Sequence, residues 1–441
     1  MSSDSNPCVA PNASNGSLPS VPWYKRIGPG LITACMVIGP GSIMTSSKIG
    51  ANDGYSMLWV VAVSVIFMMT YMTLGAKLGA VAAAAPGDLI RQKAGSWLAV
   101  AVGTGVFFIS AAFQSGNNIG VASAFEAFID SKLTVAAVVI GFNLLAISFL
   151  FVFKDMYKTM ERLMTVFVGL MLVSFAINLI SLKPGITALL KGFVPSLGKS
   201  GEMLPVLGLV GTTFITSAAF YQAYLVRQKG WKSCDLKHGL LDARVGSCLM
   251  FLITLMLMST AAAAFSGQAV ELKDPVAVAT ALESTFGASA KIIFCLGLFS
   301  AAYSSFLVNS MVGGFMASDG LGLGCSTSDP GPKIMTTIAL LVGMSVGVAV
   351  LMFDFDRTPT IIFAQAITVV AAPLIAGVLL WLTSSKDVMG DHVNSPSTIV
   401  FAGVGFVLLL AMAAKTAFVD LPKKVNDYMQ PPVAETQDVA M

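Results

Sequence analysis

Long apolar stretches recur along the whole chain and are separated by short polar segments. A helix needs about 20 consecutive, mostly apolar residues to cross the hydrocarbon core of a bilayer, which is roughly 30 Å thick. Such stretches lie near residues 30–51, 55–83, 97–128, 133–153, 161–182, 204–226, 242–265, 290–315, 334–353, 360–383 and 398–419. The pattern therefore predicts an all-α polytopic membrane protein with about eleven transmembrane helices.

Two of these stretches are interrupted near their middle. The first contains Gly39-Pro40-Gly41-Ser42, and the sixth contains a polar patch at 212–219. Proline lacks a backbone donor and glycine removes the steric cost of unwinding, so a break is expected in the first stretch. The polar patch lies at similar depth five spans later, which predicts a matching break in the sixth. Unwound backbone inside a membrane is tolerated only where it is buried or lines a cavity. Paired breaks in two halves are typical of inverted repeats with a substrate site at the membrane midplane.

The spacing of the stretches divides the chain into six parts. Residues 1–24 and 424–441 are polar and predict disordered tails, the first of them cytoplasmic. The first repeat is expected at 25–182 and the inverted second repeat at 204–383, with five helices each. An extracellular linker is expected at 183–203, and the eleventh helix with its flanks at 384–423.

Composition restricts the class of protein further. Of the 441 residues, 56% are hydrophobic and 11% are charged, whereas about a quarter of the residues in a soluble domain are charged. The formal net charge of +3 gives no reason to expect a nucleic-acid partner. The expected partners are the lipid bilayer and a small ion, and the oligomeric state is left open, with a monomer preferred.

Cofactor and enzyme chemistry find no support in the sequence. The six cysteines are scattered and the chain has two histidines, so a disulfide scaffold, a zinc site and a haem site lack a ligand set. No nucleophile and base pair, phosphate loop or redox motif is present. We therefore expect neither an enzyme nor a bound cofactor, apart from a coupling ion.

The positions of lysine and arginine predict the orientation, because basic residues accumulate in short cytoplasmic loops. Four groups of them fall on one side of the predicted topology: Lys25 and Arg26; Arg91 and Lys93; Lys154, Lys158 and Arg162; Arg227, Lys229, Lys232 and Lys237. This bias predicts a plasma (inner) membrane protein with its N-terminus in the cytoplasm and, for eleven helices, its C-terminus outside.

Residues 39–55 resemble the first-helix signature of the Nramp divalent-metal transporters. They read Gly-Pro-Gly-Ser-Ile-Met-Thr-Ser-Ser-Lys-Ile-Gly-Ala-Asn-Asp-Gly-Tyr, where the family has Asp-Pro-Gly-Asn, then Glu-Thr-Asp, then Gly-Ala and Gly-Tyr. The resemblance continues through 74–79, 118–120, 211–224, Ser304-Ser305 and 382–390, and covers roughly 25–420. It implies the LeuT-type five-plus-five inverted repeat, in which helices 1, 2, 6 and 7 rock against helices 3, 4, 8 and 9 to give alternating access.

The chain departs from the family at the positions that bind the metal. By the resemblance, Gly39, Ser42 and Ile215 replace the three transition-metal ligands, so none of these is retained, although the tenth-helix glutamine remains as Gln365. Neutral side chains also replace the family's proton-handling acids, at Gln114 and Asn117, and its two histidines, at Ser217 and Gln222. Other acidic and polar positions become Met44, Ser46 and Lys48.

These departures predict a binding site without acidic side chains. Burying a lone ion in a low dielectric costs on the order of 20 kcal/mol by an idealised Born estimate, whereas helix N-termini and hydroxyls suit an anion. We therefore expect a secondary transporter that has lost its transition-metal site and carries a small anion, with bicarbonate as the leading candidate. The candidate substrate-binding residues are Gly39, Pro40, Gly41, Ser42, Thr45, Lys48, Gln114, Asn117, Thr212, Ile215, Thr216, Ser217 and Gln365.

Sodium is the expected coupling ion. In LeuT-type symporters a sodium ion lies between hydroxyls of the eighth helix and backbone carbonyls of the first. The matching residues here are Ser304, Ser305 and Ile38, so the resemblance implies Na⁺ symport.

Three other functions remain open from the sequence. Family resemblance favours a divalent metal cation, Mg²⁺ or Mn²⁺, held partly hydrated by hydroxyls and carbonyls. A neutral amino acid or other organic solute is a second alternative. The third is a membrane sensor that kept the fold and lost transport, since fold does not fix function.

Overall fold

The computed structural model describes residues 27–153, 155–196, 203–266, 272, 274–355, 357–420 and 422. All regular secondary structure in these segments is helical. The two predicted tails, 1–24 and 424–441, lie outside the described residues. The division into two repeats and a linker stays a prediction.

The predicted apolar stretches correspond to the long helices. Nine helical segments within the described residues are long and apolar enough to cross a membrane, or up to 11 if each bent pair counts as one span. Eight of the nine contain one long helix each: α3 (Leu58–Val81), α5 (Ser96–Glu126), α6 (Lys132–Val152), α7 (Met156–Ser181), α11 (Leu236–Phe265), α13 (Ala288–Leu321), α14 (Pro330–Met352) and α17 (Pro396–Lys415). The ninth is Gly208–Lys229. One bent pair is Pro29–Val37 with Pro40–Asp53, and the other joins the end of α15 (Arg357–Ser384) to Lys386–His392 at 66°. The all-α polytopic fold with about eleven spans is confirmed.

Four short connecting helices were not expected from the pattern: α4 (Pro86–Ala94), α8 (Ile186–Lys191), α12 (Pro275–Phe286) and α16 (Lys386–Met389). Each is too short to produce an apolar stretch of membrane-spanning length. They lie in the polar segments between the long helices.

The first span is broken where the sequence predicts it. Helix α1 (Pro29–Val37) and helix α2 (Pro40–Asp53) meet at an angle of 59°. Ile38 and Gly39 between them are extended, and each half-helix begins with a proline. Proline suits this position because the first amides of a helix have no partner within the helix.

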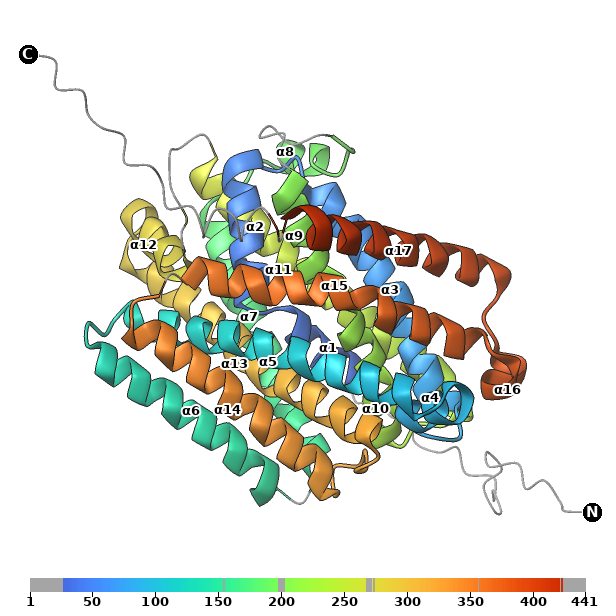
Figure 1. Ribbon diagram of the computed structural model, residues 1–441. Coiled ribbons are helices and arrows are strands. Elements are labelled where there is room, and N and C mark those ends of the chain that lie inside the picture. Colours follow the sequence, from blue (N-terminus) through green and yellow to red (C-terminus); the bar gives the residue numbers. More distant parts are fainter. Residues whose placement is uncertain are drawn as a thin grey trace, which may run out of the picture.

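The sixth span is also interrupted, but Gly208–Lys229 counts as one membrane-spanning segment without the sharp bend of the first. Helix α9 (Met203–Thr213) ends two residues before α10 (Thr216–Lys229), and Ile215 in the gap has an extended backbone. Figure 1 shows α1 in the middle of the molecule, with α6 and α14 along one edge and α17 along the opposite edge. The residues of both breaks, Ile38 and Gly39 in the first and Phe214 and Ile215 in the second, are buried, so both breaks lie inside the protein.

Glycines allow α3 to pack directly on α10. A Cβ atom added at Gly75 would overlap the carbonyl oxygen of Ala219, and one at Gly79 would overlap that of Ala223. Small residues four positions apart are a common way for membrane helices to approach one another closely. This contact fixes α10, and with it the second break, against α3.

The close contact predicts that Gly75→Ala destabilises the protein. The added methyl group must push α10 away from α3, and overpacking of this kind costs about 1–3 kcal/mol. Thermal unfolding in detergent should therefore occur at a lower temperature. Gly141→Ala on α6 is the matched control, because a Cβ there meets no atom within 4 Å. A Gly75→Ala variant as stable as the parent would contradict the packing.

Candidate functional site

Gly39 lies where three spans meet. A Cβ atom built on Gly39 would lie 3.0 Å from Ser305 Oγ of α13 and 3.3 Å from Asn117 Oδ1 of α5. Pro40, the next residue, packs against Gly120 of α5. The break in the first span therefore faces hydroxyl and amide groups of the opposing helices.

Ser42 connects the two broken spans. Its hydroxyl donates a hydrogen bond of 2.7 Å to the carbonyl of Val37 and lies 3.3 Å from the carbonyl of Thr212. Both carbonyls belong to the last turn of a half-helix, α1 in one case and α9 in the other. Such carbonyls have no partner within the helix and form the negative end of its dipole. A positively polarised hydrogen is thus held between two negative helix ends.

Ser305 makes a similar contact with the backbone of the first span, whereas its neighbour Ser304 contacts that span only through the Cys35 side chain. The Ser305 hydroxyl donates to the carbonyl of Met36 at 3.0 Å. The Ser304 hydroxyl donates to Ala301 within its own helix, at 3.2 Å. Of the two serines predicted to hold sodium, Ser305 is the one hydrogen-bonded to the backbone of α1. Ile38, the third predicted residue, is buried beside this carbonyl at the end of α1.

At the second break the predicted residues point in different directions. The Thr216 hydroxyl donates to the carbonyl of Ala372 on α15 at 3.1 Å, and that of Thr212 bonds back to Gly208 in its own helix. Ser217 is buried, and its hydroxyl has no hydrogen-bond partner in the described part of the chain. Ile215 is buried at the start of α10. To the candidate binding site, this break contributes the Thr212 carbonyl and the Ser217 hydroxyl.

The amides of the third span divide between two neighbours. Asn117 faces Gly39, and its Nδ2 lies 3.4 Å from Gln114 Oε1. The Gln114 side chain itself packs on Gly343 of α14, away from α1. Asn117 is therefore a direct neighbour of the break, and Gln114 contacts it through Asn117.

The remaining predicted residues lie on α2, the second half of the first span, or on α15. Gly41 and Thr45 are half-buried on α2, with the Thr45 methyl beside Gly208 of α9. Lys48 is half-buried one turn further along. Gln365 belongs to α15, but its side chain lies outside the described atoms.

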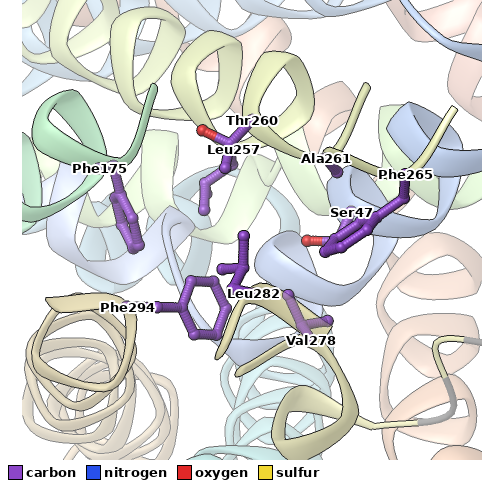
Figure 2. Close-up of a pocket in the computed structure, with 9 residues that line it drawn as sticks. All are labelled: Ser47, Phe175, Leu257, Thr260, Ala261, Phe265, Val278, Leu282 and Phe294. Atoms are coloured by element: carbon purple, nitrogen blue, oxygen red, sulfur yellow. The ribbon is translucent and has the colours of Figure 1, made fainter. Parts of the chain in front are cut away.

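A small cavity beside α2 is a poor place for an ion. Figure 2 shows the nine residues that line it, of which Ser47 and Thr260 carry the only polar side-chain groups. The others are aliphatic or aromatic, including Phe175, Phe265 and Phe294. An ion there would lack the oxygen ligands that could replace its water.

Two buried acids are not among the residues predicted from the sequence. Asp242 on α11 accepts hydrogen bonds from the amides of Gly28 and Gly30, and Asp319 on α13 accepts from the amide of Gly87 and the hydroxyl of Tyr224. Both are at most 3% exposed. Asp242 is the first residue of an apolar stretch, and an acid at that position is readily assigned to the polar segment that precedes the helix. An ionisable residue within a membrane span is by default a functional candidate. An acid inside a predicted span is therefore the signal in the sequence that could have identified Asp242.

The side chains at the break carry no formal charge. Across the described segments, no group of three histidine, cysteine or acidic side chains comes together to hold a metal. What the break offers is neutral oxygen: carbonyls at two helix ends, serine and threonine hydroxyls, and the amide of Asn117.

Known proteins share the sequence pattern and the architecture of this chain. Residues 30–418 match the family profile described as natural resistance-associated macrophage protein-like, Nramp. The chain belongs to the Nramp family. It is 25% identical over 396 residues to the divalent metal cation transporter MntH of Deinococcus radiodurans, covering 88% of each chain. Its identity to MntH of Pectobacterium carotovorum is 26% over 376 residues, which is 83% of this chain and 88% of the relative.

Solved structures share the fold. A crystal structure of the Eremococcus coleocola manganese transporter, in complex with an aromatic bis-isothiourea substituted compound, matches with a TM-score of 0.79 at 17% identity. The match covers 93% of this chain and 89% of that one. The LeuT-type fold with helices 1 and 6 broken is thereby confirmed, and the chain is a membrane transporter of this family, not an enzyme.

The prediction of a bicarbonate or other small-anion carrier is wrong. The relatives are named divalent metal cation transporters and the structural neighbours are manganese transporters. The geometry gives a physical reason for the error. Ser42 and Ser305 direct their hydrogens at carbonyls of half-helix C-termini, and Pro40 leaves the N-terminus of α2 with one amide donor fewer. The break therefore presents oxygen to a ligand more than it presents N–H groups.

Restoring the family's three ligands should create a transition-metal site. The variant Gly39→Asp, Ser42→Asn and Ile215→Met adds a carboxylate, an amide and a thioether at the break. Ligand charge sets cation affinity, and sulfur favours soft metals. We expect calorimetry to show Mn²⁺ and Cd²⁺ binding at least about tenfold tighter than in the parent. Equal affinities in parent and variant would contradict the predicted correspondence of these positions.

Proposed function

We propose that this chain is a secondary transporter of a divalent cation bound at the break of the first span, with Mg²⁺ as the leading candidate and Mn²⁺ as the second. One observation carries the proposal. The Ser42 hydroxyl donates its hydrogen to the carbonyl of Val37 at 2.7 Å, and its oxygen lies 3.3 Å from the carbonyl of Thr212; these carbonyls are at the C-terminal ends of α1 and α9. A cation in place of that hydrogen would meet both carbonyls and the Ser42 oxygen.

The electrostatics of the break support a cation that keeps part of its water. Each helix C-terminus acts as roughly half a negative charge, so α1 and α9 together supply about one, which the N-termini of α2 and α10 at the same breaks partly oppose. That is less than a divalent cation needs if it is fully dehydrated. Mg²⁺ gives up its water reluctantly and usually retains several water ligands in proteins. All the groups at the break are hard oxygen donors, which favours Mg²⁺; the names of the relatives favour Mn²⁺.

The membrane and the orientation form part of the proposal. Basic side chains gather at the face where α1 begins: Lys229 pairs with Glu161 at 2.6 Å, and Arg227 donates to the carbonyl of Ala82 at 2.8 Å. Basic residues accumulate on the cytoplasmic side of plasma-membrane proteins. We infer that this face is cytoplasmic and that the protein lies in the plasma membrane.

Flux measurements test the proposed cargo. Purified protein in liposomes that contain a Mg²⁺ or Mn²⁺ indicator should admit Mg²⁺, Mn²⁺ or both. Ser42→Ala removes one oxygen ligand and should raise the half-saturating cation concentration about tenfold, the usual size for a lost bond to a charged group. Ser345→Ala on α14 is the control, because that hydroxyl is exposed and bonds to its own helix. Absence of flux for both cations, with folded protein in the vesicles, would reject the proposal.

We also propose that Na⁺ couples to this transport through Ser305. The Ser305 hydroxyl oxygen and the Met36 carbonyl oxygen are 3.0 Å apart at the junction of α13 and α1. Both are neutral hard oxygens, and a Na⁺ ion that displaced the hydroxyl hydrogen would be shared by the two helices. The ion would then stabilise one relative position of the first and eighth spans.

The two adjacent serines provide a matched test of the coupling ion. Ser305→Ala should weaken the Na⁺ dependence of cation flux about tenfold in half-saturating Na⁺. Ser304→Ala should leave it within about twofold, because its hydroxyl donates within α13 and meets only the Cys35 thiol of α1, not a backbone carbonyl. A Na⁺ dependence that is absent in the parent, or equal in all three proteins, would remove the role assigned to Ser305 and leave the divalent-cation proposal standing.

A further inference from the structure

The N-terminus of α1 is attached to a single carboxylate. Asp242 Oδ1 accepts a hydrogen bond from the amide of Gly28 at 2.7 Å, and Oδ2 accepts one from the amide of Gly30 at 2.6 Å. Asp242 lies on α11, more than 200 residues away in the sequence, and is 1% exposed. The carboxylate thus caps the positive end of α1, where negative charge is stabilised.

Three glycines make this contact possible. A Cβ atom on Gly30 would overlap the backbone carbonyl of Asp242, and one on Gly246, a turn further along α11, would overlap the carbonyl of Gly30. A Cβ on Gly28 would lie 2.7 Å from Glu161 Oε1. Helix α1 therefore rests directly on the backbone of α11, and no larger side chain fits between them.

A second tether runs through Gln222 of α10. Its Nε2 donates to Asp242 Oδ2 at 3.1 Å, while its Oε1 accepts from the Thr33 hydroxyl of α1 at 2.5 Å. Asp242 thus accepts three hydrogen bonds, two from α1 and one from a side chain that also holds α1. The carboxylate is the common point of both tethers.

In this conformation α1 blocks one side of the break. All nine residues of α1 are buried, and the helix is separated from α2 by the extended residues Ile38 and Gly39. The hydrogen bonds to Asp242 are the attachment at its far end. A cation released from the break toward this face must pass where α1 lies.

We propose that Asp242 is the positioning residue that holds α1 closed, and that release of the Gly28 and Gly30 amides from its carboxylate opens the break to the face at which α1 begins. The direction of cargo rests on the proposed function, whereas the attachment itself does not. Opening leaves no stranded charge, because water that enters along the displaced helix solvates the carboxylate in place of the amides.

Cys35 provides a reporter of this movement within α1. It is fully buried, with its sulfur 3.8 Å from the carbonyl of Met164 on α7, so a membrane-impermeant maleimide reaches it only when α1 leaves its place. The other five cysteines are replaced by serine or alanine. Asp242→Asn keeps the shape but turns an N–H toward one of the two amides. We expect the rate of Cys35 labelling to rise about tenfold or more, as for loss of a bond to a charged group.

Two further variants make the test decisive. Ser247→Ala on the same helix is the control, because that hydroxyl bonds to Met72 and Ala243 and not to α1; its labelling should equal the parent's. Gly246→Ala should also raise labelling, since the methyl group pushes α1 outward without touching the carboxylate. Labelling of a folded Asp242→Asn protein at the parent's rate, while Gly246→Ala raises it, would overturn the proposal.

A failure to fold does not leave the question open. If Asp242→Asn cannot be purified, Gln222→Met removes the shared tether at similar volume and should raise labelling by a smaller factor; an unchanged rate would then overturn the proposal. The rate of Cys35 labelling can be measured without any transported cation. A labelling response without Mg²⁺ or Mn²⁺ flux therefore counts against the proposed function alone, and flux without a response counts against Asp242 alone.

Discussion

Unpaired backbone groups at membrane depth are the constraint on which this structure depends. A bilayer core offers no water, so every amide and carbonyl released by a helix break must find a partner within the protein. The carbonyls of Met36, Val37 and Thr212 are met by the hydroxyls of Ser305 and Ser42. The amides of Gly28 and Gly30 are met by a carboxylate. The glycine contacts between helices bring these groups within reach.

The sequence predicts the helices and their breaks well, because both are local properties. Apolar stretches of membrane-spanning length fix the long helices, and Gly39 with Pro40 fixes the first break. Partners across the fold are not local. That Ser305 faces α1 while Ser304 bonds to its own helix, or that Thr216 reaches Ala372 on α15, depends on how the helices are rotated against one another. The role of Asp242 depends on residues more than 200 positions away.

The error about the sign of the substrate has the same origin. The sequence shows no charged side chain at the break, but it does not show the partial charges that the backbone carries there. A broken helix exposes both a positive and a negative end, and the sequence does not say which end receives the ligand. The structure shows hydroxyl hydrogens of Ser42 and Ser305 drawn toward the negative ends.

The sequence Gly-Pro-Gly occurs at 28–30 and again at 39–41, at the start of α1 and of α2. Helix α1 is therefore a rigid rod of nine residues with a joint at each end. At 1.5 Å per residue the rod is about 13 Å long, so a rotation of about 20° about Gly39 would carry its far end roughly 5 Å. That displacement is wider than a water molecule. In the proposed opening, a short helix that pivots about Gly39 would turn the loss of two hydrogen bonds into a gap wide enough for water.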